Sequence, residues 1–224
     1  GIAYDCYRDG RLVGEVRLPI PGRHNALNSL GALIAGTYAG LSFAQMRDSL
    51  LAFGNARRRF EVWAEVDGIR VVDDYAHHPT EIRATLAAAR EQGRGRVVAV
   101  FQPQRYSRTH WLMDEFATAF QDADVLVLTR IYSPPGERPI PGVSAEVLAA
   151  RIQENTGRPV TLLSDHGEIL RFLLEEVRPG DTVLTMGAGD IWKVARALAE
   201  ALKARVPTRT ASSDSGPQAP GSGR

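Results

Sequence analysis

The sequence has little that would suit an exported, membrane-bound or nucleic-acid-binding protein. Its single cysteine, Cys6, has no partner for an internal disulfide, which fits a reducing compartment, and we expect a cytoplasmic protein. No apolar run approaches the ~20 residues that a membrane-spanning helix needs, and no basic start with an apolar stretch marks a signal peptide. The 27 basic and 26 acidic residues nearly cancel, so no basic excess indicates nucleic acid as a partner.

Two nucleotide-binding motifs are also missing. The pattern G-x-x-x-x-G-K-[ST], which cradles the phosphates of ATP in many enzymes, does not occur, so a phosphate loop of that kind would have to lie outside this chain. The stretch MGAGD (186–190) begins like a dinucleotide fingerprint, but Trp192 takes the place of the third glycine. A free-standing dinucleotide-binding module would need the complete motif near its first strand. We therefore interpret MGAGD as a tight turn between a strand and a helix.

The chain is long enough for a sizeable core, since 44% of its 224 residues are hydrophobic. It opens on GIAYDCYRDG without an initiating methionine, and we expect it to be a portion of a longer protein. Its end is rich in Ser, Gly and Pro, a composition typical of disordered segments, and we expect a disordered tail over 204–224.

The pattern of strands and helices predicts an α/β fold. Asp9-Gly10 and Asp67-Gly68 each lie between two strand-like runs and predict two β-hairpins. Between the hairpins, apolar spacing predicts one helix from Asn25 and another from Ser42 to about Phe53. Beyond the second hairpin we expect helices over 80–91, 109–121, 144–155, 166–177 and 190–203, alternating with strands over 96–101, 124–131, 159–163 and 181–187. This alternation predicts a parallel sheet covered by helices on both faces.

Polar side chains gather where the predicted strands end. Asp73, Asp74, His77 and His78 follow the strand run IRVV, and they would suit metal ligands or acid–base groups, or a solvated loop in which His78 caps the next helix. Because an open α/β sheet binds ligands beyond the carboxyl ends of its strands, DDYAHHP, QPQRYSR, RIYSPPGE and GAGD are expected to share one edge.

Basic and amide side chains form three further candidate groups. Arg105 and Arg108 follow a strand, and each guanidinium can bind a carboxylate or a phosphate at two points, although two surface arginines would give the same pattern. Residues 57–59 form a run of three arginines, which is either a solvated face or a phosphate contact. In GRHNALN (22–28), His24 and Asn28 lie one helical turn apart, and helix capping by His24 or Asn25 is the alternative to a binding role.

Taken together, these motifs resemble one family. HNALN, RRRFE, DDYAHHPTEI, FQPQRYSRT, IYSPPGERPIPGVS and GAGD occur here in the order found in the ATP-dependent muramyl ligases of peptidoglycan synthesis, and the resemblance covers about residues 1–203. It implies the end of a P-loop ATPase domain over 1–56 and a Rossmann-like ligase domain over 57–203. The amino-terminal half, with the P-loop and the UDP-sugar domain, is then missing, and the isolated chain is expected to be inactive.

The resemblance also implies a reaction. L-Alanine is joined to UDP-N-acetylmuramate through an acyl phosphate, with ATP and Mg²⁺ as cofactors, and no metal ligand is assigned to this chain. The alternatives are a muropeptide-recycling ligase of the same family and a non-catalytic Rossmann-like binding module. The recycling ligase more often carries Phe where Tyr75 stands and lacks the acid at Glu81, which favours the alanine-adding reaction.

By resemblance, the nucleotide is held by five residues. His24, Asn25 and Asn28 would hold the adenine, Arg59 would reach the phosphates, and Asp74 would lie near the ribose. The amide of Asn28 can both donate and accept, as the N6 and N7 atoms of adenine require.

By resemblance, the carboxyl edge of the sheet holds the amino acid and the acyl phosphate. Tyr75, His77, Arg105 and Arg108 would shape the alanine pocket, and the catalytic residues would be Arg59, Asp74, His77, Arg105 and Arg108. Gln104 stands where the family commonly has His, and a glutamine keeps hydrogen bonding but cannot become cationic.

Overall fold

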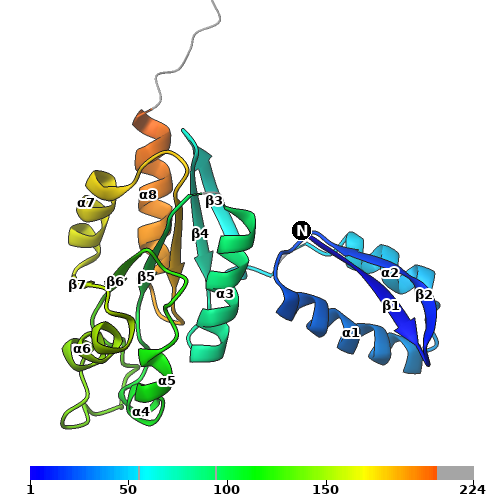
Figure 1. The fold of residues 1–224 in the computed structure, drawn as a ribbon, viewed down its shortest axis with the longest axis horizontal. Coiled ribbons are helices and arrows are strands. Elements are labelled where there is room, and N and C mark those ends of the chain that lie inside the picture. The colour runs from blue at the N-terminus through cyan, green and yellow to red at the C-terminus, as the bar shows by residue number, and fades with distance from the viewer. Residues whose placement is uncertain (55, 94, 206–224) are drawn as a thin grey trace, which may run out of the picture.

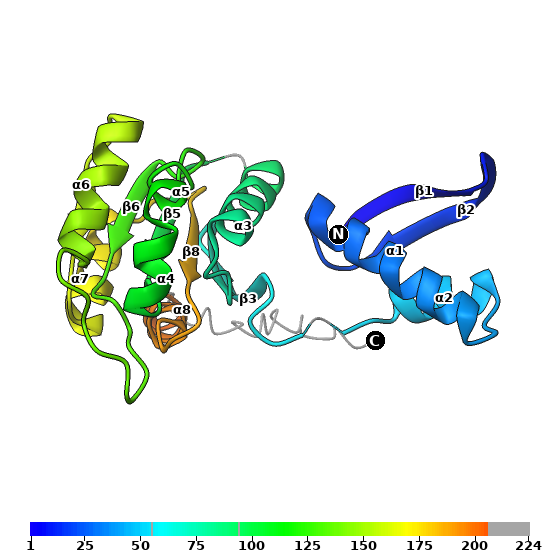
Figure 2. The ribbon, with the colours of Figure 1, turned by 90° about the horizontal axis from the view of Figure 1, so that it is seen from below.

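The structure, a computed structural model, describes residues 1–54, 56–93 and 95–205. These residues form a small amino-terminal lobe and a larger lobe built on a six-stranded sheet (Figures 1 and 2). The tail expected over 204–224 lies outside the described residues from position 206 onward.

The small lobe is a β-hairpin packed against two helices. Strands β1 (Ile2–Arg8) and β2 (Arg11–Leu18) pair antiparallel, and Asp9 and Gly10 both have positive φ, as a type I′ turn requires. Helices α1 (Arg23–Tyr38) and α2 (Phe43–Leu51) bury Leu33 and Met46 against the hairpin. The predicted hairpin is confirmed.

The starts of these two helices differ in how they are capped. Helix α1 begins at Arg23, two residues before the predicted start, and its N-cap is Gly22 without a side-chain hydrogen bond. Capping by His24 or Asn25 was therefore a wrong alternative. Helix α2 is capped by Ser42 and Gln45 in a reciprocal capping box, and it ends at Leu51, two residues before the predicted end.

The large lobe confirms the predicted α/β fold. Its sheet contains β3 (Glu61–Val66), β4 (Ile69–Asp74), β5 (Val97–Phe101), β6 (Val125–Leu128), β7 (Val160–Leu162) and β8 (Thr182–Met186). The strand order is β3-β4-β8-β5-β6-β7, and every pair is parallel except the predicted β3–β4 hairpin. The last strand in the chain thus lies between β4 and β5.

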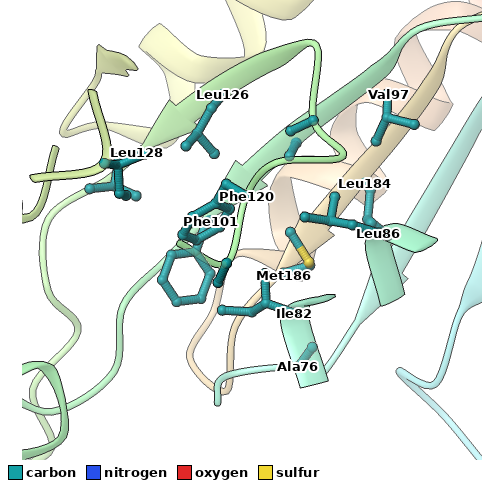
Figure 3. Close-up of a cluster of buried hydrophobic side chains, with 14 of the residues drawn as sticks. Ala76, Ile82, Leu86, Val97, Phe101, Phe120, Leu126, Leu128, Leu184 and Met186 are labelled. Carbon is teal, nitrogen blue, oxygen red and sulfur yellow. The ribbon is translucent and has the colours of Figure 1, made fainter. Parts of the chain in front are cut away.

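Helices pack on both faces of this sheet, because alternate residues of the buried strands point to opposite sides. On one face, α3 (Pro79–Gln92), α5 (Met113–Ala117) and α6 (Ala145–Thr156) cover a cluster around Phe101. Figure 3 shows Phe101 beside Phe120 and Ile82 in this cluster. On the other face, α7 (His166–Glu176) and α8 (Trp192–Arg205) cover Val71, Val98 and Val183.

One helix prediction was wrong in detail. The single helix expected over 109–121 is two short helices, α4 (Tyr106–Trp111) and α5. They break at Leu112, whose φ of −113° and ψ of 20° depart from helical values. The break lets Phe116 and Phe120 pack on Phe101, with ring centroids 5.6 and 5.2 Å from it.

The position of β8 brings the polar turns together. It places the turn after Met186 between the turn that follows β4 and the turn that follows β5. A sheet whose strand order reverses in this way opens a crevice at the carboxyl ends of the strands beside the reversal. Within the described part of the chain, none of the helices has the length and apolar character needed to cross a membrane.

Candidate functional site

Asp74 is a buried carboxylate that joins β4 to the segment entering β3. Its Oδ2 accepts from the backbone N–H of Phe60 at 2.7 Å, and its Oδ1 accepts from the backbone N–H of Ala76 at 2.7 Å. Burial raises the pKa of Asp74 to about 6, although both amide bonds act to lower it. The carboxylate therefore fixes the start of the turn that carries Tyr75 and His77.

Asp73 belongs to a second buried network. Its Oδ2 lies 2.8 Å from Nε of Arg58, and its Oδ1 accepts from the hydroxyl of Thr185 at 2.6 Å. Burial raises the pKa of this carboxyl, and the bonds from Arg58 and Thr185 act in the opposite direction. Both oxygens are engaged and the side chain is fully buried, which favours a structural role for Asp73 over the predicted alternatives of a metal ligand or an acid–base group.

Arg58 links three parts of the sheet edge. Besides Asp73, its guanidinium donates to the carbonyl oxygen of Gly187 at 2.6 Å and to that of Gly189 at 3.1 Å. It also lies over the ring of Tyr75, 5.1 Å from the centroid. The sequence offered only a run of three arginines, and no local pattern distinguishes Arg58 from its neighbours.

A cleft of about 630 Å³ lies between α1 and α3 and is lined by all five residues predicted to hold the nucleotide. They are His24, Asn25, Asn28, Arg59 and Asp74. The apolar part of its wall includes Leu18, Ile20, Leu50 and Phe53. The structure thus brings these residues together in one concave surface of mixed polarity, as small-molecule sites usually are.

The polar side chains that line this cleft differ in hydrogen bonding, exposure and protonation. Asn25 donates its side-chain N–H to the carbonyl oxygen of Pro21 at 2.6 Å, so its amide nitrogen serves the turn before α1. Asn28 is exposed in the cleft one turn further along the helix. Burial and the charge of Arg59 lower the pKa of His24, which favours a neutral imidazole at neutral pH.

His77 and Tyr75 lie on the turn after β4, with their rings edge to face at 5.2 Å. Nδ1 of His77 lies 2.8 Å from the carbonyl oxygen of Tyr75, and since a carbonyl only accepts, the proton belongs on Nδ1. Burial lowers the pKa of His77 although this bond and Glu81 act to raise it. The ring is therefore favoured in its neutral form, with Nε2 as an acceptor.

Glu81 stands between the cleft and this turn. Its Oε2 accepts from the backbone N–H groups of His77 and His78, at 2.9 and 3.1 Å, and lies 3.4 Å from Nδ1 of His77. Burial acts to raise the pKa of Glu81, but the two amide bonds together with the charges of His77 and Arg59 hold the pKa below its ordinary value. His78 is the N-cap residue of α3, as one of the alternatives predicted.

The two predicted arginines follow β5 at the same edge. Arg105 is exposed, has a φ of +70°, and donates its backbone N–H to the carbonyl oxygen of Tyr132 at 2.9 Å. Arg108 is half-buried, and its guanidinium donates to Oε1 of Gln104 at 3.1 Å. Burial and the charge of Arg105 lower the pKa of Arg108. A bound anion would relieve this repulsion, which suits the pair to a carboxylate or a phosphate.

The GAGD turn is packed too tightly against its neighbours to accept side chains at its glycines. A Cβ atom at Gly187 would lie 2.7 Å from the carbonyl oxygen of Gln102, and Gly187 has a φ of +147°. A Cβ atom at Gly189 would lie 2.8 Å from the ring of Tyr132. These contacts support the interpretation of GAGD as a structural turn.

Comparison with known proteins shows which family the chain belongs to. The structure is an α/β lobe with two arginines, Arg105 and Arg108, at the carboxyl edge of its sheet and a cleft beside it. Residues 58–189 match the family model described as the Mur ligase, glutamate ligase domain, and the chain belongs to this family. The resemblance to the muramyl ligases is therefore confirmed.

Individual relatives are similar over most of the chain. All 224 residues align at 86% identity with the UDP-N-acetylmuramate–L-alanine ligase of Symbiobacterium thermophilum, covering 46% of that protein. Among solved structures, the UDP-N-acetylmuramate–alanine ligase MurC of Thermotoga maritima aligns with 88% of this chain and 42% of its own, at 28% identity and a TM-score of 0.72. A murein peptide ligase of Psychrobacter arcticus aligns with 87% of this chain and 40% of its own, at 27% identity and a TM-score of 0.63. The chain spans about half the length of the relatives it matches.

Proposed function

We propose that this chain is the carboxyl-terminal portion of an ATP-dependent ligase that joins L-alanine to UDP-N-acetylmuramate in peptidoglycan synthesis. The observation that carries the proposal is the turn over residues 73–82. Its Asp74 and Glu81 line the cleft suited to a nucleotide. Its Tyr75 and His77 lie near enough to Arg108 to interact with it electrostatically, and we call Arg105 and Arg108 the arginine edge. The names of the similar alanine ligases supply the substrates.

We also propose domain boundaries for this chain and a cellular compartment for the enzyme. Residues 1–56 are the end of the central ATPase domain, and residues 57–203 are the carboxyl-terminal ligase domain. The P-loop and the UDP-sugar domain belong to the missing amino-terminal half, so this chain alone does not ligate. We place the enzyme in the cytoplasm, where the single cysteine would stay reduced.

The residues of the cleft fit an adenine nucleotide. Its volume of about 630 Å³ falls within the ~300–1,000 Å³ usual for small-molecule sites. Asn28 presents both a donor and an acceptor to the adenine edge, and Arg59 supplies a cation for the phosphates. When bound, ATP supplies the phosphoryl group that activates the sugar carboxylate.

The described residues offer fewer groups for binding Mg²⁺ than for binding the nucleotide. Within residues 1–54, 56–93 and 95–205, no three His, Cys, Asp or Glu side chains are grouped to hold a metal ion. Mg²⁺ at phosphate-transfer sites is typically held by one or two carboxylates and by the phosphates themselves. We therefore propose Mg²⁺ as a cofactor of the whole enzyme without assigning it a ligand here.

The arginine edge suits the amino acid. One guanidinium would bind the alanine carboxylate, and the other would face the acyl phosphate, where negative charge develops as the amine attacks. The amine must be unprotonated to attack, and neutral His77, with Nε2 as an acceptor, is suited to take a proton from it. Asp74 would hold the turn that places His77.

The experiment that tests this function needs a full-length enzyme. We define the hybrid ligase as this chain joined behind the amino-terminal half of the 86% identical Symbiobacterium relative. With ATP, Mg²⁺, UDP-N-acetylmuramate and L-alanine, it is expected to release ADP and phosphate and to form the alanyl product. The chain alone is expected to form none. Turnover by the chain alone, or none by a folded hybrid, would refute the proposal.

Asn28 tests the nucleotide side of the cleft. Asn28→Ala removes two hydrogen bonds to the base, so we expect the apparent KM of the hybrid ligase for ATP to rise by an amount worth about 1–3 kcal/mol. The KM for alanine should change less, because the arginine edge is untouched. Steady-state kinetics measure both constants, with Asn155→Ala on the exposed face of α6 as the control. An unchanged dependence on ATP would remove Asn28 from the site.

A further inference from the structure

Glu137 lies in the loop after β6, and its carboxylate is the centre of a hydrogen-bond network at the start of α4. Oε1 accepts from the backbone N–H of Ser107 at 3.1 Å and from its hydroxyl at 2.7 Å. Oε2 accepts from the backbone N–H of Tyr106 at 3.2 Å and from the hydroxyl of Ser133 at 3.2 Å. One side chain thus connects the loop after β6 to the loop after β5.

Backbone bonds extend this connection to the arginines. The N–H of Arg105 donates to the carbonyl oxygen of Tyr132 at 2.9 Å, and the N–H of Tyr132 donates to that of Pro103 at 2.8 Å. Arg105 has a φ of +70°, a conformation that a residue other than glycine keeps only when its surroundings fix it. The network of Glu137 holds the two residues that directly follow Arg105.

The charge of Glu137 also matters at this edge. Burial acts to raise the pKa of Glu137, but the hydroxyl and amide groups that it accepts from hold the pKa below its ordinary value. The carboxylate is therefore ionised at neutral pH. Its charge acts on Arg108 in the direction that offsets the repulsion from Arg105.

We propose that Glu137 is a positioning residue that fixes Arg105 and Arg108 and thereby sets the affinity of the ligase for the carboxylate of its amino-acid substrate. This inference rests on the function proposed above. Glu137 acts through the arginines, because its oxygens are already engaged by Tyr106, Ser107 and Ser133.

The chemistry of the network distinguishes a carboxylate from an amide of the same size. Each oxygen of Glu137 faces one backbone N–H, from Ser107 at Oε1 and from Tyr106 at Oε2, and because an N–H can only donate, both oxygens must accept. In Glu137→Gln, one oxygen becomes an NH₂ group that faces a backbone N–H and loses that bond, whichever way the amide is turned. The substitution opens one side of the network without changing its volume.

The test compares Glu137→Gln in the parent hybrid ligase and in its Arg105→Lys and Arg108→Lys backgrounds, with Glu154→Gln on the exposed face of α6 as the matched control. Because a misplacement near 1 Å can cost on the order of 100-fold, we expect Glu137→Gln to raise the KM for alanine by about 10–100-fold. The KM for ATP and the behaviour of Glu154→Gln should stay near the parent values. In the Lys background of the arginine whose own replacement raises the KM for alanine, the effect of Glu137→Gln should shrink to less than about threefold, because residues that act through one another are not additive.

A second measurement does not depend on ligation. Hydrogen exchange of the Tyr106 and Ser107 amides should quicken at least tenfold in Glu137→Gln, while exchange in β5 and β8 stays unchanged. If the parent hybrid ligates but Glu137→Gln keeps its KM for alanine, or if its effect is equally large in both the Arg105→Lys and the Arg108→Lys backgrounds, the inference is wrong. If the parent hybrid does not ligate, the proposed function fails, and unchanged exchange at Tyr106 and Ser107 would then overturn the role of Glu137 separately.

Discussion

Arg105→Lys and Arg108→Lys are expected to separate the kinetic constants of the hybrid ligase. Lysine keeps the charge of each side chain but loses the planar two-point geometry, so it should not replace arginine fully. For the arginine proposed to bind the alanine carboxylate, we expect the KM for alanine to rise by about 10–100-fold with little change in the KM for ATP. For the arginine that faces the acyl phosphate, kcat should fall by a similar factor with alanine affinity nearly intact.

The structure motivates this separation. Arg105 is exposed and leads α4, whereas Arg108 is half-buried and donates to Gln104. Two cations in such different surroundings are suited to different anions. Steady-state kinetics with each substrate varied in turn measure the effects, and Arg171→Lys on the exposed face of α7 serves as the control. If both variants match the parent in kcat and in the KM for alanine, the pair is a surface feature and the assignment of this edge is wrong.

Arg58→Met should produce a large loss of stability. It leaves the fully buried Asp73 without its cation and also removes the bonds to the carbonyl oxygens of Gly187 and Gly189. Removing one partner of a buried ion pair costs about 3–5 kcal/mol, because the remaining charge is uncompensated. We expect the free energy of unfolding of this chain, measured by urea denaturation, to fall by about that amount.

Two further variants test the cause. Arg57→Met changes an exposed neighbour and should alter the free energy of unfolding by less than about 0.5 kcal/mol. Asp73→Leu in the Arg58→Met background should recover much of the loss, because it removes the unpaired charge. Equal stability of Arg58→Met and Arg57→Met would show that the network around Asp73 contributes nothing.

The fold was largely predictable because its signals are local. Asp9-Gly10 and Asp67-Gly68 are turn residues whose positive φ values match the hairpins that they predict. The apolar strands and the periodic helices between them gave the correct class. The break at Leu112 was not predicted, because no Gly or Pro marks it in the sequence and it is accompanied by packing of Phe116 and Phe120 on Phe101.

The sequence identified many residues of the candidate site but not how they are arranged in space. Sequence motifs identified the residues that line the cleft and the edge, but their binding roles remain predictions. The strand order was not readable from the sequence, and it is this order that brings the turn after β8 beside those after β4 and β5. The sequence also did not reveal the structural roles of Arg58 and Glu137, because their hydrogen-bond partners lie far away in the chain.

The most direct test of the account offers the hybrid ligase two substrates. A murein peptide ligase is the second candidate function, because such a ligase of Psychrobacter arcticus shares this fold at a TM-score of 0.63. With ATP, Mg²⁺ and UDP-N-acetylmuramate present, kcat/KM should be measured for L-alanine and for a murein peptide whose first residue is L-alanine. The account predicts that free L-alanine is preferred by at least about 100-fold, a difference near 2.7 kcal/mol in transition-state stabilisation. A preference for the peptide would contradict it.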